Sequence, residues 1–286
     1  MKTQLSKIIS GTMTWGVWGK NLDEKSMISL MNCCLENNIT SFDHADIYGG
    51  YTTEASFGFA FANSKIDRKK VQFISKCGIQ TEVRSEIKHY DYSKNHIIWS
   101  VENSLKNLKT DYLDILLLHR PSPLMKTDEI AEAIEKLKTH GKIIDFGVSN
   151  FTPSQSVLIE TKIKIDCNQI QFSLTNFEAM NNGSLDYMQS NKIVPMAWNP
   201  LGSIFKTNDD KTDRIKETAN KLCKKYAVET DGLLLAWIVK HPAGILPVCG
   251  TTDSKRISNL MKATETEIDL EDWFELYVAS IGNKVA

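Results

Sequence analysis

Short apolar runs alternate with amphipathic stretches along most of the chain. The apolar runs are rich in branched side chains and end at polar or turn-forming residues, which is typical of strands buried on both faces. Such strands are predicted at Ile39–Asp43, Val71–Lys76, Tyr112–His119, Ile143–Ser149, Ile165–Phe172, Ile193–Trp198 and Ile245–Cys249. Between them, apolar residues recur at helical spacing, as they do at Met27, Leu30 and Cys34.

Local signals mark the ends of these helices. Asp23, Ser93 and Thr127 are predicted N-caps, because their side chains can accept hydrogen bonds from the free backbone N–H groups of a first turn. Pro153 is predicted at the first position of a helix, and Gly141 just after the end of one. Further helices are predicted near Thr53, over residues 212–226 and 230–240, and over Asp269–Ile281. The strand–helix pair therefore repeats about seven or eight times, roughly every 35 residues.

This alternation predicts a parallel sheet whose faces are covered by helices. An open sheet that binds a dinucleotide usually carries a GxGxxG segment after its first strand, and this chain has none. The number of repeats favours a closed (β/α)8 TIM barrel, with the functional site at the C-terminal rim of its strands. No linker or low-complexity segment interrupts the chain, so residues 1–286 are predicted to form a single barrel domain.

The composition excludes several classes of protein. The 34 Lys+Arg residues balance 35 Asp+Glu residues, so the chain offers no basic field for nucleic acid or anionic lipid. The longest uncharged apolar run, Gly232–Val239, is too short to cross a bilayer, and the N-terminus lacks the apolar segment of a signal peptide. The six cysteines form no CxxC pair and have no histidine at metal-ligand spacing. These features predict a cytoplasmic protein with free thiols and no metal site.

Four chemically active residues follow three neighbouring predicted strands. Asp43 and Tyr48 follow the strand at 39–43, Lys76 ends the next, and His119 ends the one after. A lysine buried at a strand end needs an anionic partner, which Asp43 can supply. The lysine charge is expected to lower the pKa of the Tyr48 phenol from about 10 and so make it a better proton donor. His119 can donate a hydrogen bond to the same substrate oxygen.

Two other interpretations compete with this one. The first is that all four residues have structural roles, because each of them taken alone is more often structural than catalytic. Only their joint placement on consecutive strand ends indicates chemistry. A metal-dependent hydrolase using Asp43, His44 and Asp46 is the second alternative. We expect it to fail, because His44 follows Asp43 on a strand and therefore points the opposite way.

These segments resemble the aldo-keto reductase superfamily from Gly11 to about residue 260. The run from Asp43 to Gly50 (DHADIYGG), with Lys76 and His119, is similar to that family's Asp–Tyr–Lys–His tetrad. The segments HADIYGGY, SKCGI, HRPSPLM and GVSNFTP are similar to those of a bacterial oxidoreductase group within it. The resemblance implies reduction of aldehydes or ketones by hydride transfer from NADPH, with Tyr48 as the proton donor.

The resemblance also implies a set of cofactor contacts. Ser149, Asn150 and Gln169 would bind the carboxamide, and Trp198 would stack on the nicotinamide ring. The remaining implied contacts are Asp46 beside the ribose, Pro200, Leu201 and Gly202 along the pyrophosphate segment, and Gly250, Thr251 and Arg256 at the adenosine phosphate end. An arginine at that end is what NADP recognition requires.

The chain departs from the family pattern in places that bear on the cofactor. Many members have Lys-Ser where this chain has Gly250-Thr251, so NADH is retained as a second candidate cofactor. Trp15 and Trp18 follow the first strand and are candidates for the substrate pocket, with a plug at the barrel's lower rim as the alternative. A monomer or weak oligomer that takes a small carbonyl substrate is expected. A nicotinamide-binding sensor with little turnover remains the alternative function.

Overall fold

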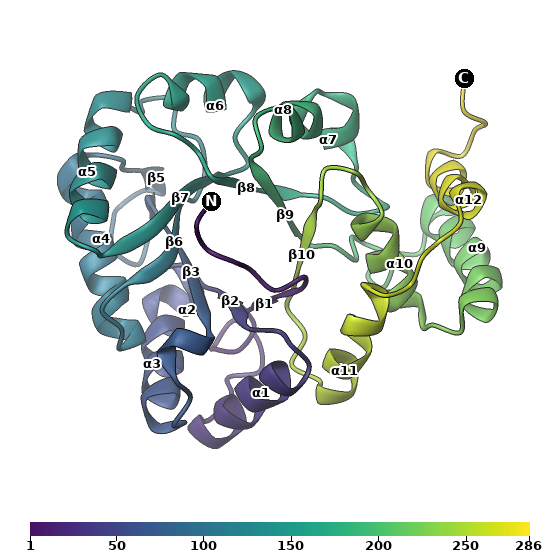
Figure 1. Ribbon diagram of the computed structural model, residues 1–286, viewed down its shortest axis with the longest axis horizontal. Coiled ribbons are helices and arrows are strands. Elements are labelled where there is room, and N and C mark those ends of the chain that lie inside the picture. The colour runs from purple at the N-terminus through teal and green to yellow at the C-terminus, as the bar shows by residue number, and fades with distance from the viewer.

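Eight parallel strands close into a barrel in the computed structural model, which describes residues 1–286 (Figure 1). Around the barrel they follow the order β1-β10-β9-β8-β7-β6-β3-β2. The strands are β1 (Ile9–Gly11), β2 (Ser41–Asp43), β3 (Gln72–Cys77), β6 (Leu113–Leu118), β7 (Ile143–Ser149), β8 (Cys167–Gln171), β9 (Val194–Trp198) and β10 (Leu246–Cys249). The predicted (β/α)8 fold is therefore confirmed, with each predicted strand present inside or close to its expected bounds.

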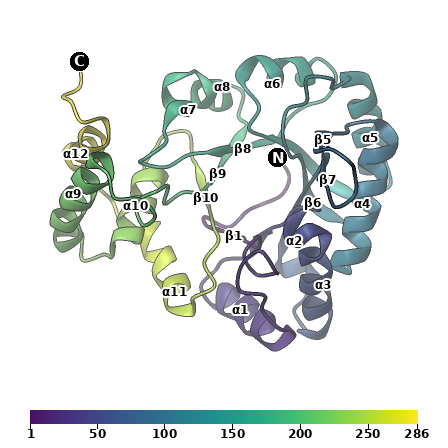
Figure 2. The same cartoon turned by 180° about the vertical axis from the view of Figure 1, so that it is seen from behind.

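Helices form the outer ring around these strands (Figures 1 and 2). They are α1 (Glu24–Glu36), α2 (Tyr48–Tyr51), α3 (Thr53–Asn63), η1 (Arg68–Lys70, a 3₁₀ turn), α4 (Lys94–Leu108), α5 (Thr127–Thr139), α6 (Pro153–Glu160), α7 (Glu178–Asn181), α8 (Ser184–Ser190), α9 (Asp210–Tyr226), α10 (Thr230–Val239), α11 (Ser254–Ala263) and α12 (Leu270–Ile281). Helices α9 and α12 lie outside α10 and carry the C-terminus away from the barrel (Figure 1). No helix combines the length and apolar character that a membrane crossing needs.

The helix-end signals are borne out with one exception. The Asp23 and Ser93 side chains accept hydrogen bonds from the backbone N–H groups of Ser26 and His96, as expected of N-caps. Pro153 occupies the first turn of α6. Thr127 was expected to cap α5, but it is the first residue of that helix and its side chain makes no capping bond.

A short hairpin that the sequence pattern missed follows β3. Its strands β4 (Ile79–Gln80) and β5 (His89–Tyr90) pair antiparallel and lie outside the barrel. Strands of two residues are too short to show an alternating pattern. The hairpin matters because Ile79, Lys88 and Tyr90 line the cavity described below.

The barrel interior is a packed core rather than a channel. Buried side chains from β1, β3, β6, β8, β9 and β10 form a small separate cluster of Ile9, Ile74, Ile115, Leu117, Cys167, Met196 and Val248. Met1 and Leu5 pack against this cluster, and the N-terminal segment crosses the ring of strands (Figure 1). This segment is tied down where the Asp145 carboxylate accepts hydrogen bonds from the backbone N–H groups of Lys2 and Thr3.

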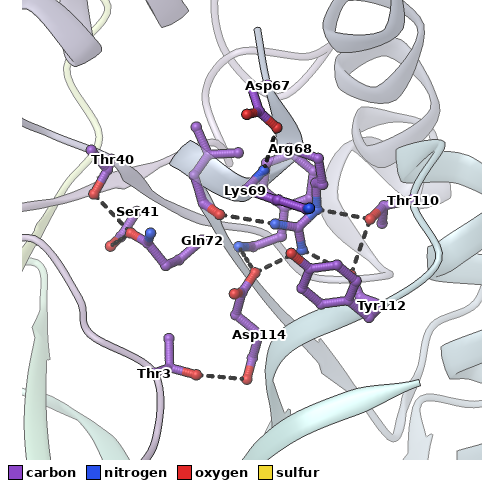
Figure 3. Close-up of polar contacts among 12 residues, drawn as sticks. Thr3, Thr40, Ser41, Asp67, Arg68, Lys69, Gln72, Thr110, Tyr112 and Asp114 are labelled. Atoms are coloured by element: carbon purple, nitrogen blue, oxygen red, sulfur yellow. Dashed lines mark hydrogen bonds and ion pairs between the residues drawn. The ribbon is translucent and has the colours of Figure 1, made fainter. Parts of the chain in front are cut away.

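A network around Arg68 fastens the N-terminal ends of β3 and β6 (Figure 3). The Arg68 guanidinium donates to Thr110 Oγ1, to two backbone carbonyl groups and to Asp114 Oδ2, the last at 2.7 Å. The same Asp114 oxygen accepts a hydrogen bond from the Phe73 N–H. These donors and acceptors satisfy one another at the end of the barrel opposite the cavity, so their role is to stabilise the fold.

Strand register brings the candidate residues together at the other end. Asp43 lies beside Gly11 of β1 and Ile74 of β3, while Lys76 lies beside Leu117 of β6. His119 follows β6 directly. Because parallel strands end at the same rim, the polar side chains of three neighbouring strands meet there.

Candidate active site

One large cavity, of about 850 Å³, opens at the C-terminal rim of the barrel. This volume is in the range of small-molecule and cofactor sites, roughly 300–1,000 Å³. Asp43, Tyr48 and His119 line one part of the cavity, and Arg256 lines another. The cavity therefore joins the strand ends at β2 and β6 to the region where α11 begins.

A buried lysine connects the residues at the barrel centre. The Lys76 Nζ atom lies 2.7 Å from Asp43 Oδ2, 2.8 Å from the His44 carbonyl oxygen and 3.0 Å from the Tyr48 hydroxyl. The Lys76 side chain is 1% exposed and that of Asp43 is 3% exposed. Gly49, which follows Tyr48, has a φ of +62° and allows the chain to turn sharply there.

The three contacts of Lys76 fix the direction of the Tyr48 proton. An ammonium group has three hydrogens and no acceptor, so each contact must be a donation by Lys76. The Tyr48 oxygen therefore accepts, and its own O–H hydrogen is available to a group in the cavity. Asp43 holds Lys76 charged: although burial opposes the charge, Asp43 and Tyr48 raise the pKa of Lys76.

The direction of the Tyr48 pKa shift differs from the sequence expectation. Burial raises the pKa of the Tyr48 phenol above its ordinary value, and Lys76 offsets only part of this effect. The predicted lowering was wrong because it counted the lysine charge and omitted the loss of water around a buried phenolate. Tyr48 therefore remains protonated at neutral pH, the form that can donate a proton.

His119 lies against Tyr48, with ring centroids 6.2 Å apart. Burial lowers the pKa of His119 well below its usual range, and the nearby charges of Lys76, Arg120 and Lys88 add to the shift. The imidazole is therefore neutral at neutral pH. Its Nδ1 atom is buried without a hydrogen-bond partner.

A chain of hydrogen bonds connects the central residues to the next strand ends. Gln169 Nε2 donates to Asp43 Oδ1 at 2.9 Å, which leaves the Gln169 side-chain oxygen free to accept. Ser149 donates to the Gln169 carbonyl oxygen, and Asn150 donates to Ser149. Trp198 Nε1 donates to Asn150 Oδ1 at 2.9 Å, which fixes the orientation of the indole in the cavity wall.

The other predicted cofactor residues continue along the same cavity. The predicted residues that line it beyond Trp198 are Pro200, Leu201, Gly202, Gly250, Thr251 and Arg256. Gly202 has a φ of +57°, and a side chain there would collide with Thr175 Oγ1. The free amide oxygen of Gln169, the Trp198 indole, glycine backbone and Arg256 all line this cavity. This combination of polar and apolar groups fits an extended nicotinamide nucleotide.

Two predicted site residues, Trp15 and Asp46, lie outside the cavity. Trp15 is 0% exposed and packs against Phe42 and Phe57 in the main core, so its assignment to the substrate pocket was wrong. Trp18 does line the cavity, with its ring 6.3 Å from that of Tyr48.

Asp46 also lies outside the cavity, so its predicted contact with a ribose was wrong. It accepts a hydrogen bond from Ser100 of α4 in the buried layer beneath the rim. Burial and the nearby Glu54 carboxyl raise the pKa of Asp46 to about 7. The loop after β2 turns this side chain outward, a direction that residue spacing alone did not reveal.

The alternative metal site lacks a converging set of ligands. The His44 ring packs against Phe57 and Phe73, and its Nδ1 contacts Thr12 Oγ1, on the side away from the cavity. Burial lowers the pKa of His44 to about 3. The expected alternation of side chains along β2 is therefore observed, and it removes the histidine from the proposed hydrolase site.

Four charged residues of the cavity wall had no role assigned from the sequence, and one of them is Lys206, in the segment after β9. The other three are Lys88 on the hairpin, Arg120 beside His119, and Asp231 in the first turn of α10. Lys88 and Asp231 lie in segments without a recognisable motif. Arg120 directly follows His119, and this adjacency was the one available signal.

Comparison with known proteins identifies the family. The model of the Aldo/keto reductase family matches residues 7–278. The uncharacterized oxidoreductase YcsN of Bacillus subtilis is 41% identical, over 98% of this chain and 95% of its own. A 6-dehydroglucose reductase of Agrobacterium fabrum is 36% identical, over 100% of this chain and 97% of its own.

A solved structure has the same fold. The aldo-keto reductase from Klebsiella pneumoniae in complex with NADPH aligns with a TM-score of 0.77 at 23% identity, over 95% of this chain and 90% of that chain. The chain belongs to the aldo/keto reductase family, as its sequence resemblance indicated. It is an oxidoreductase of that family, whose substrates are small-molecule carbonyl compounds.

Proposed function

We propose that this protein uses NADPH to reduce an aldehyde or ketone to an alcohol, with Tyr48 as the proton donor. One observation carries the proposal: Lys76 donates to Tyr48, so the phenol hydrogen is free to point into the cavity. When bound, NADPH supplies a hydride from C4 of its nicotinamide ring. Family membership and the NADPH-bound relative support this choice of cofactor.

The catalytic roles follow from the protonation states. Neutral His119 donates a hydrogen bond to the substrate oxygen and orients the carbonyl group. As negative charge develops on that oxygen, Tyr48 transfers its proton to it. Lys76, held charged by Asp43, stabilises the phenolate that this transfer leaves.

The cofactor contacts follow the order of residues along the cavity. Gln169, Ser149 and Asn150 would bind the carboxamide, and Trp198 would support the ring. The remaining contacts would be Pro200, Leu201, Gly202, Gly250, Thr251 and Arg256. Asp46 has no part in this set.

Titration with NADPH tests the proposal directly. We expect NADPH to quench tryptophan fluorescence at micromolar concentrations, because Trp18 and Trp198 line the cavity. The protein should then consume NADPH when an aldehyde is added. Binding without turnover of any carbonyl compound would favour the sensor alternative. Tryptophan fluorescence that does not change on addition of NADPH would contradict both the reductase and the sensor.

Unpaired positive charges in the cavity wall beside His119 favour a substrate that is rich in oxygen atoms. The Arg120 guanidinium lies 5.4 Å from the Trp198 ring and makes no hydrogen bond or ion pair within the protein. Lys88 lines the same region and also has no ion-pair partner. Unused donors of this kind suit hydroxyl or carbonyl oxygens of a sugar-like aldehyde. The name of the Agrobacterium relative, 6-dehydroglucose reductase, supports the same substrate class.

Replacing Arg120 with methionine should separate two kinds of substrate. We expect KM for a polyhydroxylated aldehyde to rise by about 10- to 100-fold, because a hydrogen bond to a charged donor is lost. For an apolar aldehyde such as benzaldehyde, KM should change by less than about threefold. Lys7→Met, an exposed cation before β1, is the control. Equal changes for both aldehydes would contradict the assignment of Arg120.

We propose the remaining properties on simpler grounds. The six cysteines are free thiols, which supports a location in the reducing cytoplasm. The closure of β1 on β10 supports treating residues 1–286 as one domain. A net charge of −1 supports a protein that acts on small molecules, without nucleic acid or membrane partners.

A further inference from the structure

An ion pair occupies the end of the cavity where α10 and α11 meet. Arg256 Nε lies 3.6 Å from Asp231 Oδ2, and both side chains line the cavity. The Arg256 side chain is 51% exposed, whereas that of Asp231 is only 11% exposed. The only arginine at this end of the cavity is therefore accompanied by a largely buried acid.

Asp231 is held in place by its own helix. Its Oδ1 atom accepts a hydrogen bond from the Gly232 N–H at 2.9 Å, which leaves Oδ2 facing Arg256. The first turn of a helix favours a negative charge, because the free N–H groups point toward it. Rotating the carboxylate away from the cavity would break this hydrogen bond. Asp231 is thus a fixed negative charge in the cavity wall.

Few other positive groups are available nearby. Lys255 is exposed and does not line the cavity. Lys206 lines the cavity, but its Nζ contacts Asn199 Oδ1, at the end of β9. Gly250 and Thr251 contribute no charge. The charges of Arg256 and Asp231 therefore largely cancel at this end of the cavity.

We infer that Asp231 is a specificity-determining residue that lowers the preference of this protein for NADPH over NADH. This inference rests on the proposed function, in which Arg256 faces the adenosine end of the cofactor. A 2′-phosphate held by Arg256 comes close to the Asp231 carboxylate, and the two negative charges repel each other. A 2′-hydroxyl has no charge and can donate a hydrogen bond to Asp231 Oδ2. The acid therefore penalises NADPH and assists NADH.

The measurement is the dissociation constant of each nucleotide, followed by quenching of tryptophan fluorescence. We expect the two constants of the wild-type protein to lie within about tenfold of each other. In Asp231→Asn, NADPH should bind about tenfold more tightly, while the constant for NADH stays the same or rises slightly. High salt should shrink this difference, because the Arg256 side chain is 51% exposed.

Two further variants complete the experiment. Asp186→Asn is the control, because it removes an exposed acid from the first turn of another helix, α8, that does not line the cavity at this residue. It should leave both dissociation constants unchanged. Arg256→Gln should weaken NADPH more than NADH. A purely structural role of Asp231 would lower the melting temperature without altering the ratio of the two constants.

The failures can be told apart. A wild-type preference for NADPH above about 100-fold, or an unchanged ratio in Asp231→Asn, would overturn the inference and leave the proposed function standing. If neither nucleotide binds the wild-type protein, the proposed function fails and the inference fails with it.

Discussion

Replacing Tyr48 with phenylalanine should lower kcat/KM for carbonyl reduction by about 10²- to 10⁴-fold, the usual contribution of a positioned general acid. Phenylalanine keeps the ring that packs near Trp18 and His119 and removes only the hydroxyl group. Lys76 loses one of its three acceptors but keeps Asp43 and the His44 carbonyl. The dissociation constant of NADPH should therefore change little, and the loss should appear in kcat.

A second tyrosine provides the matched control for this experiment. Tyr90 also lines the cavity, and its hydroxyl makes no hydrogen bond within the protein. Tyr90→Phe should keep most of the activity, so it separates the removal of any cavity hydroxyl from the removal of the proton donor. Near wild-type turnover in Tyr48→Phe would show that the proton comes from another group, with His119 as the next candidate.

The barrel was predictable from sequence because its strands are buried on both faces. A run such as Leu113–Leu118 is interpreted as a strand, because its apolar residues do not show the spacing of an amphipathic helix. The rim residues were predictable for a related reason. In a parallel barrel all strands end at one rim, so chain order alone places Asp43, Lys76 and His119 together.

Side-chain directions in the loops after the strands were not predictable in this way. Asp46 and Tyr48 are two residues apart, yet one contacts α4 and the other lines the cavity. Their directions depend on the turn that follows β2, where the strand period of two no longer applies. Trp15 was misassigned for the same reason, because the loop after β1 carries it into the core between Phe42 and Phe57.

The second limit on prediction from the sequence is that some charges in the site come from segments that are distant along the chain. Asp231 meets Arg256 only because α10 packs on α11, and no local pattern relates the two residues. The pKa of Tyr48 shows the same limit in energetic terms. Its direction depends on how much water the fold removes from the phenol, and residue spacing carries no measure of that quantity.

The ion pair behind Tyr48 should also have a large effect on stability. Asp43→Asn keeps the size and shape of the side chain but leaves the Lys76 ammonium without a counter-charge at 1% exposure. Breaking a buried pair in this way typically costs about 3–5 kcal/mol. We expect a decrease of that size in the free energy of unfolding, measured with urea at pH 7. Glu132→Gln breaks a surface pair with Lys94 at the same 2.7 Å separation, and should cost less than about 1 kcal/mol.

The pH dependence of the Asp43→Asn protein shows whether the unpaired charge is the cause. Without Asp43, burial should hold the pKa of Lys76 in the folded variant below its value of about 10.4 in the unfolded chain. The unfolded state then binds more protons between the two pKa values, so the stability of the variant rises as the pH increases through that window. The loss of stability relative to wild type should therefore shrink between about pH 7 and pH 10.

Asp43→Asn/Lys76→Met removes the buried charge altogether and should regain part of the lost stability at pH 7. If the double variant is as unstable as the single one and the deficit is independent of pH, the cost comes from packing and from the lost acceptor for Gln169.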